Sequence, residues 1–342
     1  MTELAAAHPP ASAAGSDSGS GRDTATGLTD GDAGAGSGPG GRRGWRPRSG
    51  WTPLAMASPP VLVVLVFVGL PVLIGIAYTF GYTGGFNAIA TSLAVSVRNT
   101  TSGWPILSAY RSVFSSPSFR ADLLITIEVT VISVAIVVAL AWAIALYARL
   151  SGGRFGRLLS GIAVLPLFIP IVIGAYSIRK FYANTGFLVS MAKHVGLDLP
   201  SLSYHTSAIV IGQVWASLPF AVLLISSGLA AVPEALMEAA RDSGASRARA
   251  VWSVMLPMTT VPTVIVATFT AVSIMGSFTV PYLTGPTAPN MLGVTMTLTY
   301  NAYQRPQDAQ VMAVVLFVLA AGIGAFYLRA TARQSRTSAA IS

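Results

Sequence analysis

The chain has 342 residues, of which 53% are hydrophobic and only 10% are charged, and its formal net charge is +9. This composition favours a membrane protein, and the absence of cysteine excludes disulfides, thiol catalysis and zinc–thiolate sites. The basic residues stand in short clusters between apolar runs rather than on a basic helix interleaved with aromatic residues, so we do not expect nucleic-acid binding.

The N-terminal segment, residues 1–50, is rich in Gly, Ser, Ala and Asp and has almost no large apolar side chains. Such a segment buries too little surface to offset the entropy of ordering, so we expect a disordered tail. It is too long and too polar to be the start of a signal peptide, and no cleaved leader is evident.

Six apolar stretches follow this tail, and most of them reach the ~20 residues that a helix needs to cross the hydrocarbon core. The predicted spans are residues 55–80, 121–147, 158–176, 207–230, 259–280 and 310–328. The sequence therefore predicts an all-α membrane protein of about six transmembrane helices. Its transmembrane domain would cover residues 51–330, and residues 331–342 would form a C-terminal tail.

One carboxylate, Glu128, lies well inside a predicted span, and Pro166 and Pro170 break another. An intramembrane acid usually faces a cavity or a partner, and prolines survive in spans where the freed carbonyls line a cavity. All three residues are therefore candidates for a translocation path. Two alternatives stay open: Glu128 is close enough to the outer end of its helix to snorkel into interfacial water, and the prolines are equally consistent with kinks that serve packing.

The polar segment between the fourth and fifth predicted spans, residues 231–257, carries a set of helix signals. Pro233 suits a first helical position, Gly244 suits the left-handed turn that ends a helix, and Ser246 suits the cap of a second helix over residues 247–255. The signals predict a helix–turn–helix outside the bilayer, although periodicity alone is equally consistent with an ordinary amphipathic loop.

Basic residues are more frequent beside the two termini, between the second and third spans and in residues 231–257 than in the segments on the other side. By the positive-inside rule, both termini and this loop are predicted to face the cytoplasm.

The same loop contains a spaced set of residues that resembles a known pattern. The set is Glu238-Ala239-Ala240, then three residues, Gly244, nine residues, Val254, one residue and Leu256-Pro257. The pattern is the EAA loop of binding-protein-dependent ABC importer permeases, from which only Val254 departs, because that family usually has Ile there. The resemblance covers about residues 110–328. It implies the type I importer permease fold, and we refer to residues 231–257 as the EAA loop.

The resemblance also implies that the loop couples to a cytoplasmic ATPase. Small residues would let the ATPase approach closely, and acidic residues would accept hydrogen bonds or pair with basic groups. The coupling residues that the resemblance implies are Glu238, Ala239, Ala240, Asp242, Gly244, Ala245, Ser246, Leu256 and Pro257.

The implied assembly has a dimer of ATPase subunits, a second permease subunit and an extracytoplasmic substrate-binding protein, all organised around the lipid bilayer of the bacterial cytoplasmic membrane. The chain has no G-x-x-x-x-G-K-[ST] motif, so ATP would be bound by the ATPase and this chain would need no cofactor. No nucleophile–base pair or metal-ligand cluster is visible in the sequence, so neither enzymatic activity nor a metal site is expected.

The residues around Gly244 also bear on the substrate. The run Arg241-Asp242-x-Gly244-Ala245-Ser246 resembles the branch that imports polyamines, ferric iron, sulfate or thiamine, whereas the sugar branch more often has Asp where this chain has Ser243. We therefore expect a polyamine or similar small solute or ion, with a sugar-importing permease as the alternative. A self-contained secondary carrier fits less well, because such carriers usually have several intramembrane charges and repeated halves.

Overall fold

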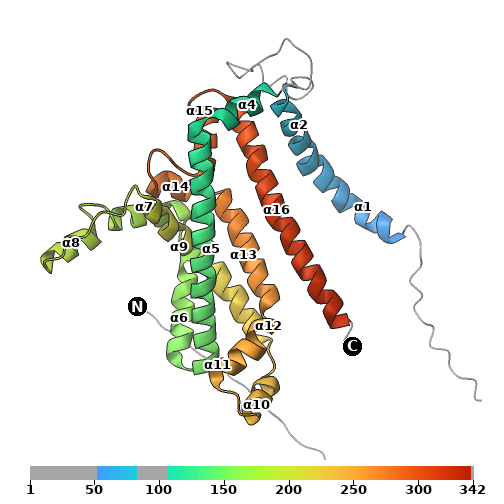
Figure 1. Cartoon of the computed structure of the whole chain (residues 1–342), viewed down its shortest axis with the longest axis vertical. Coiled ribbons are helices and arrows are strands. Elements are labelled where there is room, and N and C mark those ends of the chain that lie inside the picture. Colours follow the sequence, from blue (N-terminus) through green and yellow to red (C-terminus); the bar gives the residue numbers. More distant parts are fainter. Residues whose placement is uncertain (1–51, 83–106, 340–342) are drawn as a thin grey trace, which may run out of the picture. The chain divides into compact units, whose positions relative to one another are not determined.

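The computed structural model describes residues 52–82 and 107–339, and the side chains of residues 58–82 and 107–329. The predicted disordered tail, residues 1–50, lies outside the described residues. The described residues from Ala57 onward belong to one compact unit, and the arrangement below is that of this unit. Its described part consists of helices and their connections, with no strand (Figure 1).

Four stretches are long and apolar enough to cross a membrane: Ser58–Thr79, Pro117–Ser151, Thr206–Ala230 and Pro306–Arg329. The helices that supply them are α1 (Thr52–Val64), the π-helical turn η1 (Leu65–Gly69), α2 (Leu70–Thr79), α5 (Pro117–Ser151), α9 (Thr206–Ala230) and α16 (Pro306–Ala339). Two further pairs of helices qualify when each pair is taken as one bent span. The described residues therefore hold four candidate membrane spans, or six if each bent pair counts as one, which is the number expected.

The third predicted span is not a straight helix. It consists of α6 (Arg154–Val164), the 3-10 turn η2 (Leu165–Phe168) and α7 (Ile171–Phe181), and the chain bends by 109° at the break. Pro166 and Pro170 have no amide hydrogen to donate, and each disfavours a helical conformation in the residue before it. By contrast, the buried Pro219 is accommodated within the uninterrupted helix α9.

The fifth predicted span also departs from a single helix. It is α13 (Thr260–Met275), which ends at Gly276 and is followed by the short helices α14 (Thr279–Thr284) and α15 (Leu292–Asn301). At its other end, α13 meets the EAA loop with a bend of 65°. In the last predicted span, α16 continues as a helix to Ala339, through most of the segment predicted as a C-terminal tail.

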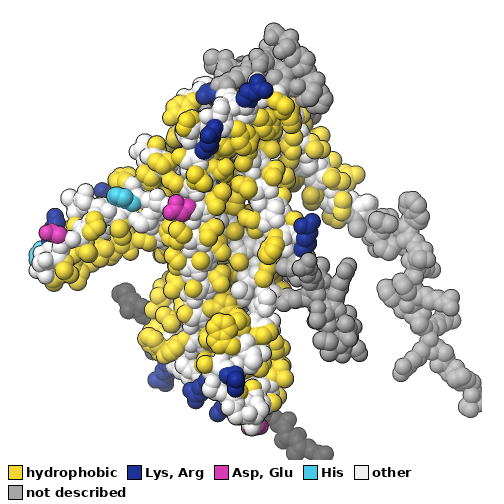
Figure 2. All heavy atoms as spheres, in the orientation of Figure 1, with side chains coloured by type: hydrophobic (Ala, Val, Ile, Leu, Met, Phe, Trp, Pro, Cys, Tyr) yellow, Lys and Arg dark blue, Asp and Glu magenta, His cyan; other side chains and the backbone are white. Residues whose placement is uncertain are grey.

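The core runs along the contact between α5 and α9, with α13 packed against both helices and against α16. Small buried residues, Ala141 and Ala145 on α5 and Ala221 on α9, allow the helices to approach closely, and larger residues such as Ile225 and Leu229 fill the space around them. Figure 2 shows hydrophobic side chains covering much of the long sides of these helices on the face drawn. This surface is the one that a bilayer would cover.

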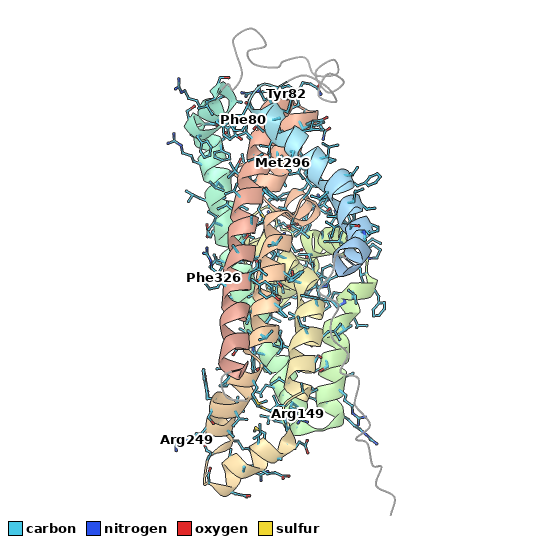
Figure 3. The ribbon with its side chains drawn as sticks, turned by 90° about the vertical axis from the view of Figure 1, so that its right-hand side faces the viewer. Phe80, Tyr82, Arg149, Arg249, Met296 and Phe326 are labelled. Carbon is cyan, nitrogen blue, oxygen red and sulfur yellow. The ribbon has the colours of Figure 1, made fainter. Side chains whose placement is uncertain are left out.

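The two ends of the unit differ in what they display. Figure 3 shows Phe80, Tyr82 and Met296 at one end, and Arg149 and Arg249 at the other. The second end carries the EAA loop (Figure 1). We call the end with Phe80, Tyr82 and Met296 the seat end and the end with the EAA loop the EAA end.

Candidate functional site

The EAA loop is a helix–turn–helix, as the sequence predicts. It contains α10 (Glu234–Asp242), α11 (Arg247–Ala250), the π-helical turn η3 (Val251–Met255) and α12 (Leu256–Met258). The first helix begins one residue later than expected, because Pro233 has an extended conformation and occupies the N-cap position.

The turn between the two helices confirms the roles predicted for Gly244 and Ser246. Gly244 has φ +83°, the left-handed region, and the Ala245 amide donates to the Ala240 carbonyl at 3.0 Å. The Ser246 hydroxyl accepts a hydrogen bond from the Arg249 amide at 3.3 Å and caps α11. No atom lies within 4 Å of the position that a Cβ on Gly244 would take. Backbone conformation therefore requires this glycine, while packing within the described chain does not.

The expected coupling residues lie mostly on the surface of the loop. Glu238, Ala239, Asp242, Gly244, Ser246 and Pro257 are exposed, and Ala240, Ala245 and Leu256 are half-buried. The opposite face of the loop is held to the core by the buried Met255 and by Met237, which packs against the same cluster. The loop thus presents a fixed, largely exposed surface of small and acidic residues.

An ion pair that the sequence analysis did not find connects the loop to the last turn of α5. Arg149 donates to the Glu234 carboxylate at 3.1 Å and to the Val232 carbonyl at 3.3 Å. Arg149 lies in the last turn of a long apolar helix and Glu234 begins a loop helix far along the chain, so no local pattern indicates their contact. The pair fixes the point where the chain enters the EAA loop.

A second feature is a cavity of about 520 Å³ between α7, α9, α13 and α14. Its lining has hydroxyl, amide and aromatic groups but no Asp, Glu, Lys or Arg. The lining residues are Ile171, Gln213, Ala216, Ser217, Phe220, Phe269, Thr270, Ser273, Ser277, Phe278 and Thr279. Gln213 and Thr270 are each only 3% exposed. Gln213 Nε2 and Thr270 Oγ1 are buried and have no hydrogen-bond partner among the described residues, so the described chain leaves both polar atoms unused.

The three path candidates from the sequence are not among these lining residues. Glu128 lies on an exposed face of α5, Pro166 is half-buried in η2 and Pro170 is exposed before α7. The structure does not bring these three residues together with the cavity or with the EAA loop. Their assignment to the translocation path stays a prediction. Gln213 and Thr270 were missed, because a single polar residue in an apolar helix does not show which way it points.

A buried carboxylate at the seat end was also missed. Asp122 is 5% exposed, and it accepts hydrogen bonds from the Asn290 amide at 3.0 Å and from the Thr295 hydroxyl at 2.7 Å. One turn further along α5, the Thr126 hydroxyl accepts a hydrogen bond from the Leu292 amide at 2.8 Å. We call this contact between α5 and residues 290–295 the seat.

The seat holds one wall of the cavity. The Asn290 side chain donates to the Pro286 carbonyl at 2.7 Å and accepts from the Met291 amide at 2.7 Å, which closes residues 286–291 into a compact turn. A Cβ on Gly293 would lie 2.6 Å from the Ser277 carbonyl oxygen, so the start of α15 packs directly against the break that lines the cavity. The seat therefore positions the wall formed by residues 277–279.

The family of the chain follows from a direct comparison. The family model described as "Binding-protein-dependent transport system inner membrane component" matches residues 123–336. The chain belongs to this family. It is therefore a multi-pass membrane permease of ABC importers, which is a transporter component rather than an enzyme class.

Two relatives differ in substrate. The permease is 31% identical over 196 residues to the trehalose transport system permease protein SugA of Mycobacterium tuberculosis, with 56% of this chain and 61% of the relative covered. It is 31% identical over 137 residues to the spermidine/putrescine transport system permease protein PotB of Salmonella typhimurium, with 40% of this chain and 47% of the relative covered. The permease thus matches less than two thirds of the length of either relative.

A solved structure confirms the fold. The permease aligns with a chain of a bacterial ABC transporter involved in the import of the acidic polysaccharide alginate, with a TM-score of 0.63 and 19% sequence identity. The alignment covers 83% of this permease and 96% of that chain. The ABC importer permease fold expected from the EAA loop is therefore confirmed.

Proposed function

We propose that this permease forms part of the substrate path of an ATP-driven importer in a bacterial cytoplasmic membrane. Both termini and the EAA loop would face the cytoplasm, where the exposed surface of the loop meets a separate ATPase dimer that binds ATP. A second permease subunit and an extracytoplasmic binding protein complete the assembly. Membership of the binding-protein-dependent family and the fixed, exposed EAA loop support this proposal.

For the substrate, we propose a neutral polyhydroxylated solute such as a sugar. The observation that carries this proposal is the cavity, which offers hydroxyl and amide groups beside Phe220, Phe269 and Phe278 but no charged side chain. A polyamine would enter such a cavity without a counter-charge, and burial of an unpaired charge is costly. The polyamine substrate expected from the sequence is not confirmed, and the match to the trehalose permease is longer than the match to the polyamine permease.

Uptake measurements test both the proposed importer function and the proposed substrate. Cells with and without the permease gene would be given radiolabelled trehalose, maltose or spermidine, and uptake would be repeated after depletion of ATP. We expect gene-dependent, ATP-dependent uptake of a sugar. Gene-dependent uptake of spermidine alone would exclude the proposed substrate, and uptake that survives ATP depletion would exclude the proposed importer.

A matched pair of variants tests the cavity itself. Thr270→Val removes the hydroxyl of a buried threonine that lines the cavity, whereas Thr268→Val makes the same change at a buried threonine of the same helix that does not line it. We expect the first variant to raise the concentration for half-maximal sugar uptake about fivefold, because one hydrogen bond to the solute is lost. The second should leave it unchanged. Equal effects of the two variants would argue against the cavity as the sugar site.

A further inference from the structure

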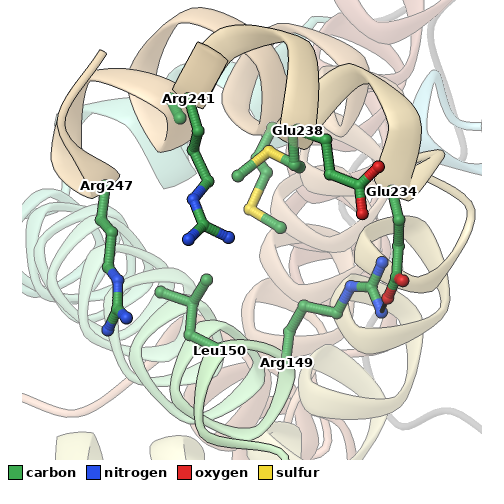
Figure 4. A pocket seen from close by; sticks show the side chains of 9 residues that line it. Arg149, Leu150, Glu234, Glu238, Arg241 and Arg247 are labelled. Atoms are coloured by element: carbon green, nitrogen blue, oxygen red, sulfur yellow. Dashed lines mark hydrogen bonds and ion pairs between the residues drawn. The ribbon is translucent and has the colours of Figure 1, made fainter. Parts of the chain in front are cut away.

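A separate hollow of about 260 Å³ lies beneath the EAA loop, between α10, η3 and the last turn of α5 (Figure 4). Part of its wall is apolar, formed by Leu150, Met237, Ala250 and Met255. Its charged side chains are Arg149, Arg241, Arg247, Glu234 and Glu238. The hollow therefore brings three arginines together on the side of the loop that faces the membrane helices.

The three arginines are not equivalent. Arg149 is engaged by Glu234 and by the Val232 carbonyl, as described above. Arg241 and Arg247 come from the two sides of the Gly244 turn, and neither guanidinium has a bonded partner among the residues that the structure describes. In Figure 4 both extend toward the end of α5, while Glu238 is turned toward Glu234.

We propose that the hollow binds a phosphate group between Arg241 and Arg247. Two guanidinium groups that line one hollow, neither of them in an ion pair within the described chain, repel each other, and an anion placed between them removes this repulsion. Phosphate suits them especially well, because the planar guanidinium donates two parallel hydrogen bonds to its oxygens.

The surroundings favour the phosphate of an anionic lipid over free phosphate. The hollow has an apolar wall beside its arginines, and large exposed aromatic side chains, Phe155 and Trp252, lie at the same end of the unit. Basic pockets beside the cytoplasmic ends of membrane helices are typical sites for such headgroups. In this respect the inference rests on the proposed function, which assigns the EAA end to the cytoplasmic leaflet.

An occupied hollow would also affect the loop. A single phosphate held by Arg241 and Arg247 links α10 to α11 across the Gly244 turn. The occupant would then help to set the angle at which the EAA loop meets the ATPase. Anionic lipid would act as a regulator of coupling without being transported.

The test uses the assembled transporter, purified from membranes and exchanged into equal amounts of phosphatidylglycerol and phosphatidylcholine. Native mass spectrometry then counts the lipids that stay bound. We expect the double variant Arg241→Gln/Arg247→Gln to retain roughly thirtyfold less phosphatidylglycerol, because the two basic residues together contribute about 2 kcal/mol near an anionic lipid surface. Phosphatidylcholine retention should not change.

Arg249→Gln is the matched control, because Arg249 carries the same charge on α11 but does not line the hollow. Figure 3 shows it on the opposite side of the loop from Arg149. Arg249→Gln should retain as much phosphatidylglycerol as the parent protein. The double lysine variant, Arg241→Lys/Arg247→Lys, should retain an intermediate amount, since it keeps the charge but loses the paired donors.

A second arm identifies the source of the phosphate. Titration of inorganic phosphate into the transporter in phosphatidylcholine discs should give no binding if only lipid occupies the hollow. Phosphate binding that the double variant abolishes would support the site but assign its occupant to the solution. Equal lipid retention by parent and double variant, together with no phosphate binding, would overturn the proposal. These readouts do not involve uptake, so their failure is distinguishable from failure of the proposed transport function.

Discussion

The EAA loop and the seat are both held by a few hydrogen bonds, but they differ in the distance along the chain that those bonds span. In the loop, the bonds that form the Gly244 turn connect residues a few positions apart, and most of the implied coupling residues are exposed. In the seat, Asp122 is buried and meets partners 168 and 173 positions away. The loop is thus specified by local backbone chemistry, whereas the seat exists only once the helices have packed.

This difference decides what the sequence could predict. A glycine required at positive φ and a serine that caps a helix leave local signals, so the helix–turn–helix was predictable, as were the uninterrupted apolar spans. The 109° bend was only partly predictable: Pro166 and Pro170 mark the break, but the angle depends on tertiary packing. Asp122, Gln213 and Thr270 could not be assigned from sequence, because their roles depend on which helix face is covered.

The largest effect is expected for Gly244→Val, which tests the locally specified turn of the EAA loop. A β-branched residue at φ +83° is strained by roughly 1–2 kcal/mol, and its bulk would lie on the proposed ATPase surface. We expect the variant to insert normally but to lose at least about tenfold in substrate-stimulated ATP hydrolysis, a barrier change of about 1.4 kcal/mol. The assay is ATP hydrolysis by the assembled complex, alongside co-purification of the ATPase.

Gly196→Val provides the control for this test. Gly196 has φ +77° and, like Gly244, no atom within 4 Å of the place where a Cβ would stand, but it lies in the connection after α8 (Phe187–His194). It therefore carries similar backbone strain away from the EAA loop. Comparable loss of ATP hydrolysis in both variants would mean that strain alone, rather than the ATPase contact, explains the effect.

The seat is tested by Asp122→Ala. Loss of the carboxylate leaves the Asn290 amide and the Thr295 hydroxyl without their partner, at a cost of about 1–3 kcal/mol for each buried group that stays unpaired. We expect a lower temperature of thermal unfolding in detergent and severalfold slower uptake. Glu128→Ala removes an acid from the same helix at an exposed position and should leave the unfolding temperature unchanged. If the two variants unfold alike, the seat contributes no stability.

A smaller effect is expected at the ion pair that joins the EAA loop to α5. The Glu234 side chain is 75% exposed, so the Arg149–Glu234 pair should contribute no more than about 1 kcal/mol. A double-mutant cycle with Arg149→Gln and Glu234→Gln, read out as ATPase affinity, measures the coupling between the two residues. Additive effects would show that the contact does not help to orient the loop.

The smallest change is expected for Glu128→Gln, which keeps the shape of the side chain and removes its charge. Because Glu128 is exposed on α5 and does not line the described cavity, we expect uptake to stay within about twofold of the parent at equal protein levels. A larger change in uptake would return Glu128 to the translocation path, as its position inside a span first suggested.

Helix α5 links the two regions, because its first turns carry Asp122 and Thr126 and its last turn carries Arg149. Between these residues it is uninterrupted, and no glycine or proline lies inside it to act as a hinge. At 1.5 Å per residue, Asp122 and Arg149 are about 40 Å apart along the axis. A helix without a hinge moves as a rigid body. A tilt of about 3° around the seat therefore displaces the Arg149 end by about 2 Å, which is enough to exchange a hydrogen bond.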